Sequence, residues 1–197
     1  MSEERTNIMD YNIDRADLAM LWKSGLSEKD IRHSVFVAEK ALDIACRTSL
    51  DLDMKLVGRG ALFHDLGKAL THAHQHGEVG AELGERLGLP PAVADIARKH
   101  FHGGLTPEEA RALGLPTKDY TPHRIEERII IYADRLVDII TDGHIKIVDD
   151  HEAEAQFEKI LTAHRHYGKD RLTRERYIRY HREIQELIRK TSAEKGE

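Results

Sequence analysis

The sequence has 197 residues, of which 40% are hydrophobic and 33% are charged, proportions typical of one soluble globular domain. Its net charge of −5 argues against an extended nucleic-acid surface, and no run of about 18 apolar residues predicts a membrane span. The charged N-terminus lacks the apolar segment of a secretory signal, and the single cysteine, Cys46, excludes an internal disulfide. We therefore expect a cytoplasmic protein in which Cys46 is a small core residue.

Helical periodicity runs through the whole chain, whereas the period-two alternation of strands is weak. Ser27 is a predicted N-cap with Asp30 three residues on, and Thr121-Pro122 predicts another helix start. We predict helices at about 14–24, 28–48, 51–66, 76–87, 91–101, 106–113, 122–142, 151–167 and 170–192. The sequence thus indicates a single compact all-α domain that ends in a charged amphipathic helix.

The histidines are unusually numerous and several fall on apolar helix faces. The chain has 13 of them, whereas average usage would give about four or five. Neighbours three, four and seven residues away share a face of a helix. By this criterion six ionisable residues lie on or beside core-facing stripes: His33, His64, Asp65, His76, His100 and Asp134. Each could have its own buried hydrogen-bond partner, but one shared metal site would satisfy all six.

The type of metal site follows from the donor atoms. Four imidazoles and two carboxylates without a thiolate are compatible with Fe, Mn, Zn, Ni, Co or Mg. Six groups are too many for one tetrahedral zinc ion and suit two ions about 3.5–4 Å apart that share a carboxylate. We expect one or two divalent ions. The first would be held by His33, His64, Asp65 and Asp134, and the second by His76, His100 and the bridging Asp65.

The order His33, His64-Asp65, Asp134 resembles the H…HD…D pattern of the HD-domain metal-dependent phosphohydrolase superfamily, and "HDLGK" resembles its HDIG subgroup. "HGEVGAE", "KHFHGGLTPEEARALGLPTKDYTP" and "EERIIIYADRLVD" are similar to a small subgroup of HDIG proteins, so the resemblance covers about residues 20–145. It implies an N-terminal helical segment over 1–26, an HD metal-binding domain over 27–145 and C-terminal helices over 146–197. His102 and His123 depart from the pattern.

The resemblance also implies a function. A phosphohydrolase of this kind would use metal-activated water to cleave a small, nucleotide-like phosphomonoester or cyclic phosphodiester. Asp65 and Lys68 are the expected catalytic residues, and Lys68, Arg135 and His102 are the expected substrate contacts. Lys68 lies one turn beyond His64, where it could contact a phosphate oxygen or remain a solvated helix-end residue.

Two other functions are compatible with the same residues. Some HD-domain proteins are di-iron oxygenases with a similar six-ligand set, and a nucleotide-sensing module could use the pocket without turnover. The complete ligand set argues against the sensor. The C-terminal helix has an apolar stripe that we expect to pack on the domain or on a partner subunit in a homodimer: Tyr177, Tyr180, Ile184, Leu187 and Ile188.

Overall fold

The computed structural model describes residues 13–147 and 149–194, and all regular elements in this part of the chain are helices, with no strand. The prediction of an all-α fold is confirmed. The elements in chain order are α1 (Arg15–Lys23), α2 (Glu28–Arg47), α3 (Met54–Phe63), the 3₁₀ helix η1 (Leu66–Ala69), α4 (His76–Arg86), α5 (Pro91–Lys99), the 3₁₀ helix η2 (Phe101–Gly103), α6 (Pro107–Ala112), α7 (Ile125–Thr141), α8 (Asp150–Ala163), α9 (Arg165–Gly168) and α10 (Arg171–Glu194).

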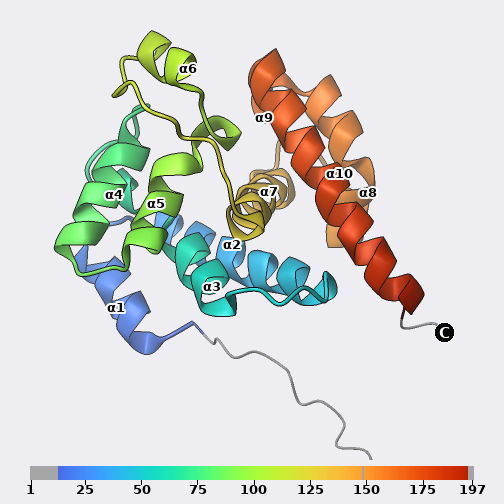
Figure 1. Cartoon of the computed structure of the whole chain (residues 1–197), viewed down its shortest axis with the longest axis horizontal. Coiled ribbons are helices and arrows are strands. Elements are labelled where there is room, and N and C mark those ends of the chain that lie inside the picture. The colour runs from blue at the N-terminus through green and yellow to red at the C-terminus, as the bar shows by residue number, and fades with distance from the viewer. Residues whose placement is uncertain (1–12, 148, 195–197) are drawn as a thin grey trace, which may run out of the picture.

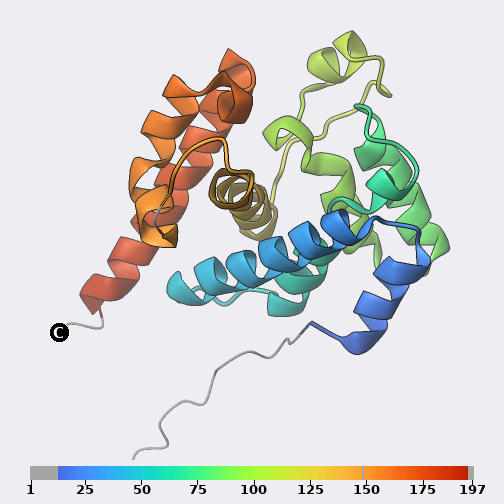
Figure 2. The ribbon, with the colours of Figure 1, turned by 180° about the vertical axis from the view of Figure 1, so that it is seen from behind.

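Helix α7 is the centre of the fold (Figure 1). It packs against α2 and α3 on one side and against α8 and α10 on the other. Its apolar residues are buried on all sides, which is typical of a helix enclosed by others: Ile129, Ile130, Ile131, Tyr132, Ala133, Leu136, Val137 and Ile139. The view from behind shows the same two groups of helices on either side of α7 (Figure 2). A side chain on this helix can therefore be held rigidly.

Local capping explains where several helices begin. The Ser27 hydroxyl accepts a hydrogen bond from the Asp30 amide at 3.1 Å, as predicted for the start of α2. The predicted start at residue 122 is wrong, because α7 begins at Ile125. The Glu127 carboxylate accepts bonds from the His123 and Arg124 amides at 2.6 and 2.9 Å, so it satisfies backbone donors that precede the helix.

The helix predicted over 51–66 also ends earlier than expected. Helix α3 stops at Phe63, and the chain continues through His64 and Asp65 into η1. Gly67 in η1 lies against the backbone of α4, where an added Cβ would be 1.8 Å from the His76 carbonyl oxygen. This contact between η1 and α4 is possible only because residue 67 has no side chain.

The C-terminal helices share the core of the rest of the protein. Tyr177, Tyr180 and Ile184 on α10 are buried in the same apolar cluster as residues of α2, α3 and α7. Arg47 on α2 donates two bonds to Glu154 on α8, at 2.7 and 2.8 Å. The apolar stripe of the last helix thus packs on the domain, the first of the two alternatives that the sequence left open. A homodimer and the boundaries proposed at 27 and 145 stay predictions.

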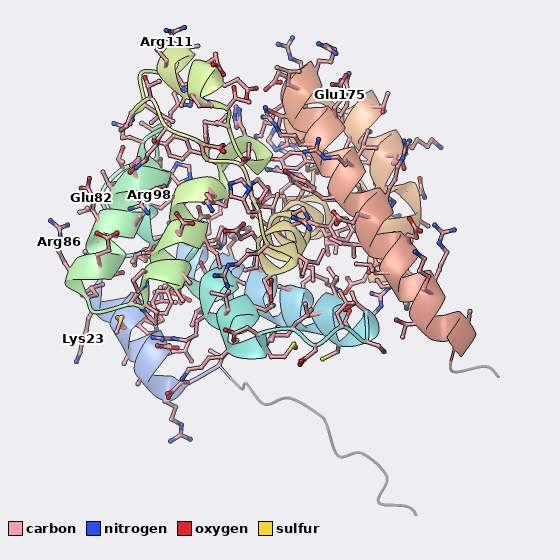
Figure 3. The ribbon with its side chains drawn as sticks, viewed as in Figure 1. Lys23, Glu82, Arg86, Arg98, Arg111 and Glu175 are labelled. Carbon is pink, nitrogen blue, oxygen red and sulfur yellow. The ribbon has the colours of Figure 1, made fainter. Side chains whose placement is uncertain are left out.

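The outer surface is charged. Glu82, Arg86, Arg111 and Glu175 are exposed on peripheral helices (Figure 3). Cys46 is also exposed, so the prediction that it packs in the core is wrong. It lies on the solvent-facing side of α2. Among the described helices, none combines the length and the apolar character needed to cross a membrane.

Candidate metal centre

Three histidines are oriented by the same local hydrogen bond. The ring nitrogen Nδ1 of each lies 2.7–2.8 Å from the backbone carbonyl oxygen three residues earlier, in the pairs His64–Ala61, His76–Ala73 and His100–Ala97. A carbonyl oxygen can only accept, so Nδ1 of each ring carries a proton and Nε2 is the nitrogen left to bind a metal ion. Metal-binding histidines commonly have this second hydrogen bond, which fixes the ring and its tautomer.

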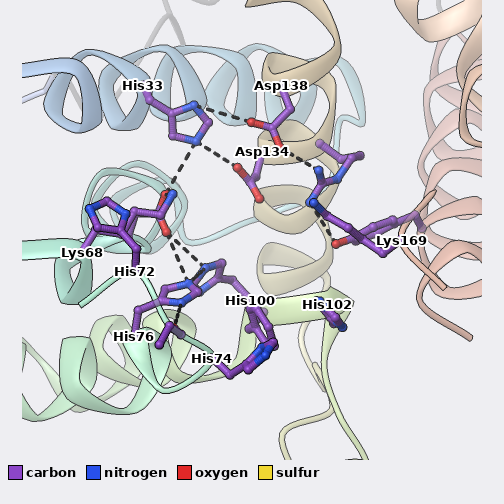
Figure 4. Close-up of a pocket in the computed structure, with 15 residues that line it drawn as sticks. His33, Lys68, His72, His74, His76, His100, His102, Asp134, Asp138 and Lys169 are labelled. Atoms are coloured by element: carbon purple, nitrogen blue, oxygen red, sulfur yellow. Dashed lines mark hydrogen bonds and ion pairs between the residues drawn. The ribbon is translucent and has the colours of Figure 1, made fainter. Parts of the chain in front are cut away.

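Asp65 lies between two pairs of histidines, and three of these four histidines, His33, His76 and His100, are labelled in Figure 4. Its Oδ2 atom is 3.3 Å from His64 Nε2 and 3.8 Å from His33 Nε2. Its Oδ1 atom is 3.3 Å from His100 Nε2 and 3.6 Å from His76 Nε2. One buried carboxylate therefore offers a different oxygen to each pair, which is the arrangement of a ligand shared by two ions.

Three ring nitrogens of the centre are poorly accounted for by hydrogen bonds alone. His76 Nε2 and His100 Nε2 are 3.1 Å apart, and two lone pairs at this distance repel each other unless a proton or a cation lies between or beside them. His64 Nε2 is fully buried and has no hydrogen-bond partner in the described chain. The donor set therefore fits divalent ions, with nitrogen and oxygen ligands facing one another across the cluster.

Helix α7 adds two carboxylates one turn apart. Asp134 Oδ1 lies 3.0 Å from His33 Nε2 and 3.5 Å from His64 Nε2. Asp138 Oδ1 lies 3.9 Å from His33 Nδ1, on the opposite side of that ring. Asp138 was not among the residues expected at this site, although it follows Asp134 by four residues and so shares its helix face. His33 is thus held between two carboxylates.

Burial and charge set the protonation of the centre. Burial lowers the pKa of His64, but Asp65 and Asp134 outweigh this effect and raise it to about 10. Burial raises the pKa of Asp65, yet His64 and His100 hold it well below its usual range. Burial together with the charge of His100 lowers the pKa of His76 to about 4. The metal-free chain therefore keeps Asp65 ionised and uses protonated His64 as the compensating cation, a role that a metal ion would take over when it binds Nε2.

The centre opens into a pocket of about 370 Å³, which is the size of a small-molecule site. The expected substrate contacts all line it, together with residues that the sequence did not single out as pocket residues, among them Asp138, Lys169 and Tyr177. Lys68 pairs with Asp65 Oδ2. Arg135 donates to Asp138 at 2.7 Å and to the Tyr177 hydroxyl at 3.0 Å, so its guanidinium is largely occupied by protein partners.

His102 stacks on the Phe101 ring at a centroid distance of 4.1 Å, and burial lowers its pKa to about 4. It is therefore neutral at physiological pH and could donate a hydrogen bond but not a charge. His123 lies outside the pocket, where it is exposed beside Asp119 at 3.6 Å. Asp142, His144 and His166 form a further His/Asp group on the surface, and all three are exposed to solvent.

Comparison with known proteins identifies the fold that carries this centre. Residues 30–137, more than half of the chain, match the HD domain family. The chain belongs to the HD domain family. The family assignment agrees with the resemblance drawn from His33, His64-Asp65 and Asp134, which all lie within the matched region.

The relatives of this chain differ in name and in how much of their own length the match covers. An uncharacterized protein of Methanocaldococcus jannaschii is 36% identical over 170 residues, which are 85% of this chain and 94% of that protein. The tRNA (cytidine(56)-2'-O)-methyltransferase of Thermoplasma volcanium is 41% identical over 119 residues, which are 60% of this chain but only 35% of the methyltransferase. Ribonuclease Y of Aquifex aeolicus is 36% identical over 83 residues, or 41% of this chain and 14% of that enzyme.

A solved structure has the same fold. The HD domain of the Listeria monocytogenes phosphodiesterase PgpH, in complex with cyclic-di-AMP, aligns with a TM-score of 0.60 over 92% of this chain and 96% of that one. The sequence identity is 18%. This alignment extends well beyond residues 30–137, so the helices that flank the matched region of this HD domain have counterparts in the PgpH structure.

Proposed function

We propose that this HD domain is a metal-dependent phosphohydrolase that cleaves a small, nucleotide-like phosphoester. The observation that carries the proposal is the position of Asp65, which offers Oδ2 to His33 and His64 and Oδ1 to His76 and His100. A donor set of this kind suits two divalent ions that share a carboxylate, and such pairs are common in enzymes that hydrolyse phosphoesters.

The proposed ligands divide into two groups around Asp65. His33, His64, Asp65 and Asp134 would hold the first ion. Asp65, His76 and His100 would hold the second. When bound, the ions would lower the pKa of a water molecule and neutralise the oxygens of the phosphate group. The Nδ1 hydrogen bonds of three of these histidines keep their Nε2 atoms directed at the centre, so little reorganisation is needed.

Lys68 is the proposed phosphate contact nearest the centre. Its ammonium group pairs with Asp65, and burial of the side chain is outweighed by Asp65 so that the Lys68 pKa is raised. Lys68 is therefore charged at every physiological pH. A phosphate that enters the pocket could accept a hydrogen bond from this ammonium group, which would stabilise the charge that develops on the non-bridging oxygens.

Two kinds of substrate deserve priority in a test. The PgpH domain is described in complex with cyclic-di-AMP, which supports a cyclic dinucleotide, and the name Ribonuclease Y supports an RNA phosphodiester. The panel should therefore contain cyclic dinucleotides, nucleoside 2',3'-cyclic phosphates, short RNA with a 2',3'-cyclic end, and nucleoside monophosphates. The pocket of about 370 Å³ favours the small members of this panel.

The experiment combines metal analysis of the purified chain with this panel in the presence of Mn, Fe, Co, Ni, Zn or Mg. We expect metal-dependent hydrolysis of at least one phosphoester, lost in Asp65→Ala and retained in His123→Ala, which removes an exposed histidine outside the pocket. No hydrolysis with any of the metals would refute the proposal. Oxygen uptake by the iron-loaded chain would then support the oxygenase, and nucleotide binding without turnover would support a sensor.

A further inference from the structure

Lys169 has an unusual backbone conformation at the edge of the pocket. It connects α9 to α10 with φ 58° and ψ −108°, which are the angles of the first central residue of a type II′ turn. Glycine dominates at that position because a side chain there is strained. Three non-glycine residues of the described chain have positive φ, and two of them, His102 and Lys169, line this pocket. Strain of this kind is concentrated at functional sites.

The turn around Lys169 is fixed from both sides. Gly168 packs so closely on α8 that an added Cβ would lie 2.4 Å from the Leu161 carbonyl oxygen. On the other side, the Asp170 carboxylate accepts bonds from the backbone amide and hydroxyl of Thr173, at 3.0 and 2.6 Å, and so caps α10. Glycine is therefore required at residue 168 for close packing against α8. The positive φ of the turn then occurs at the next residue, Lys169, which has a side chain.

Lys169 also differs from the other cations of the pocket in its partners. Lys68 pairs with Asp65, and Arg135 pairs with Asp138. Lys169 makes no ion pair within 4.0 Å with any described residue, although it is half-buried beside Arg135. Burial and the charge of Arg135 both lower the Lys169 pKa. The more distant charges of Asp138 and Asp134 offset these effects only in part. A partly desolvated ammonium group without an ion-pair partner is costly, so Lys169 is suited to bind an anionic group that enters the pocket.

The position of Lys169 separates it from the proposed metal ligands. In Figure 4 it enters from the side of Asp138 and α10, whereas Lys68 enters from the opposite side. None of the ion pairs and hydrogen bonds of the Asp65 cluster includes Lys169. A phosphate held at that cluster beside Lys68 would leave the Lys169 ammonium free for another anionic group.

We propose that Lys169 binds a second phosphate group of the substrate, distinct from the phosphate that is cleaved. The inference rests on the proposed function, because the cleaved phosphate is assigned to the Asp65 cluster. It narrows the substrate to molecules with two phosphate groups, such as a dinucleotide or a nucleotide phosphorylated at two positions. It also assigns a role in substrate choice to the segment after residue 137, which lies outside the matched HD domain.

The test is a binding measurement with phosphonates, which cannot be hydrolysed. Alkane-α,ω-diphosphonates with chains of two to six carbons are titrated into the full chain by calorimetry, each beside the alkyl monophosphonate of the same length. We expect the best diphosphonate to bind wild type at least about tenfold more tightly than its monophosphonate, the usual contribution of one charged hydrogen bond. Lys169→Gly should abolish this advantage and leave monophosphonate binding unchanged, whereas Lys169→Arg should retain most of it.

A stability measurement separates lost binding from lost folding. Glycine relieves the positive φ, so Lys169→Gly should unfold about 2–4 °C higher than wild type. Ser49→Gly is the matched control, because Ser49 also has a positive φ, of 52°, but is exposed outside the pocket. It should gain stability without a change in binding.

The inference would be overturned if wild type bound the diphosphonates no more tightly than the monophosphonates, or if Lys169→Gly still bound them more tightly. It would also be overturned if Lys169→Gly weakened the binding of both ligands equally, because Lys169 would then contact the phosphate at the Asp65 cluster. Turnover is not measured in this experiment. A failure of the phosphohydrolase panel and a failure of this inference can therefore be told apart.

Discussion

Substitution of Gly67 by alanine should damage the metal centre without touching any of its ligands. A Cβ at residue 67 would lie 1.8 Å from the His76 carbonyl oxygen and 2.7 Å from the Gly80 amide nitrogen. Both are backbone atoms of α4, so neither can rotate away. Real Cβ atoms essentially never approach closer than 3.0 Å, so the gap of 1.8 Å must widen by about 1.2 Å.

The structure indicates what such a displacement would break. Helix α4 carries His76, whose Nε2 is 3.1 Å from His100 Nε2 and 3.6 Å from Asp65 Oδ1. It cannot move freely away from η1, because on its other side Gly77 packs against α5, where an added Cβ would be 2.9 Å from the Ala97 carbonyl oxygen. A shift of α4 by about 1 Å between η1 and α5 should lower the folding free energy by about 1–3 kcal/mol. It should also lower the rate of phosphoester hydrolysis by about 10²-fold.

The metal content should respond unequally. His33, His64 and Asp134 lie on other elements, so the group proposed for the first ion should survive, and metal per chain should fall to about half. Elemental analysis, thermal unfolding followed by circular dichroism, and the rate on the best phosphoester of the panel measure the three effects. Gly84→Ala is the matched control on the same helix, because its Cβ would approach only side-chain atoms, the end of Leu89 at 3.1 Å and of Leu66 at 3.7 Å, and no backbone atom.

We expect Gly84→Ala to keep wild-type metal content and to be at least as stable as wild type, since alanine is favoured over glycine within a helix by about 1 kcal/mol. A Gly67→Ala protein with wild-type melting temperature and full metal content would refute the reasoning. It would mean that η1 and α4 can separate without disturbing His76.

Three other substitutions test separate parts of the structure. Asp65→Ala should remove both ions, whereas His76→Ala should lower the metal content by about half, as elemental analysis would show. Lys68→Ala should reduce phosphoester turnover by about 10²–10³ with metal content intact, and Lys68→Arg should restore part of the rate. Burial raises the pKa of Glu154, but its bonds with Arg47 outweigh this and lower it. This pair therefore stabilises the fold above about pH 4 and ceases to do so as acid protonates Glu154. Glu154→Gln should cost about 2 kcal/mol at pH 7 in denaturant unfolding. The difference should begin to shrink below about pH 4 and disappear only at the lower pH where folded Glu154 is itself protonated.

Each of these expectations has a clear contrary result. Wild-type metal content in Asp65→Ala would remove Asp65 from the ligands. A wild-type rate in Lys68→Ala would mean that Lys68 only pairs with Asp65 and does not contact the phosphate. A Glu154→Gln effect at pH 7 that persists undiminished at about pH 2 would show that packing, and not the charge of the pair, stabilises the contact between α2 and α8.

Helix periodicity was sufficient to predict the class of fold and the gathering of six ionisable residues. It works because a buried helix face must be continuous, so an ionisable group within an apolar stripe is brought to the core with its neighbours. The same reasoning failed for Cys46, which lies on the solvent-facing side of α2. With 3.6 residues per turn, a shift of one position along a helix can move a side chain from the buried face to the exposed face. A small side chain such as that of cysteine occurs on either face, so its type does not show which face it occupies.

The residues that periodicity could not predict depend on tertiary contacts. Helix α7 starts at Ile125 and not at Pro122 because the Glu127 carboxylate accepts bonds from the preceding amides. Lys169 enters the pocket through a turn whose glycine is already used for packing against Leu161. No pattern along the sequence reports such an arrangement, because the constraint comes from a helix that lies next to the turn only after folding.

The position of two of the histidines at helix ends adds negative potential to the metal centre. His64 and His100 are the C-cap residues of α3 and α5, so both helices end at the metal centre. The C-terminal end of a helix behaves as roughly half a negative charge. Two such ends supply about one negative charge from peptide dipoles alone, in addition to the carboxylates. The backbone itself therefore attracts cations to the metal centre. Asp65→Asn removes one carboxylate charge but leaves both helix ends in place, so it should weaken metal binding and not abolish it.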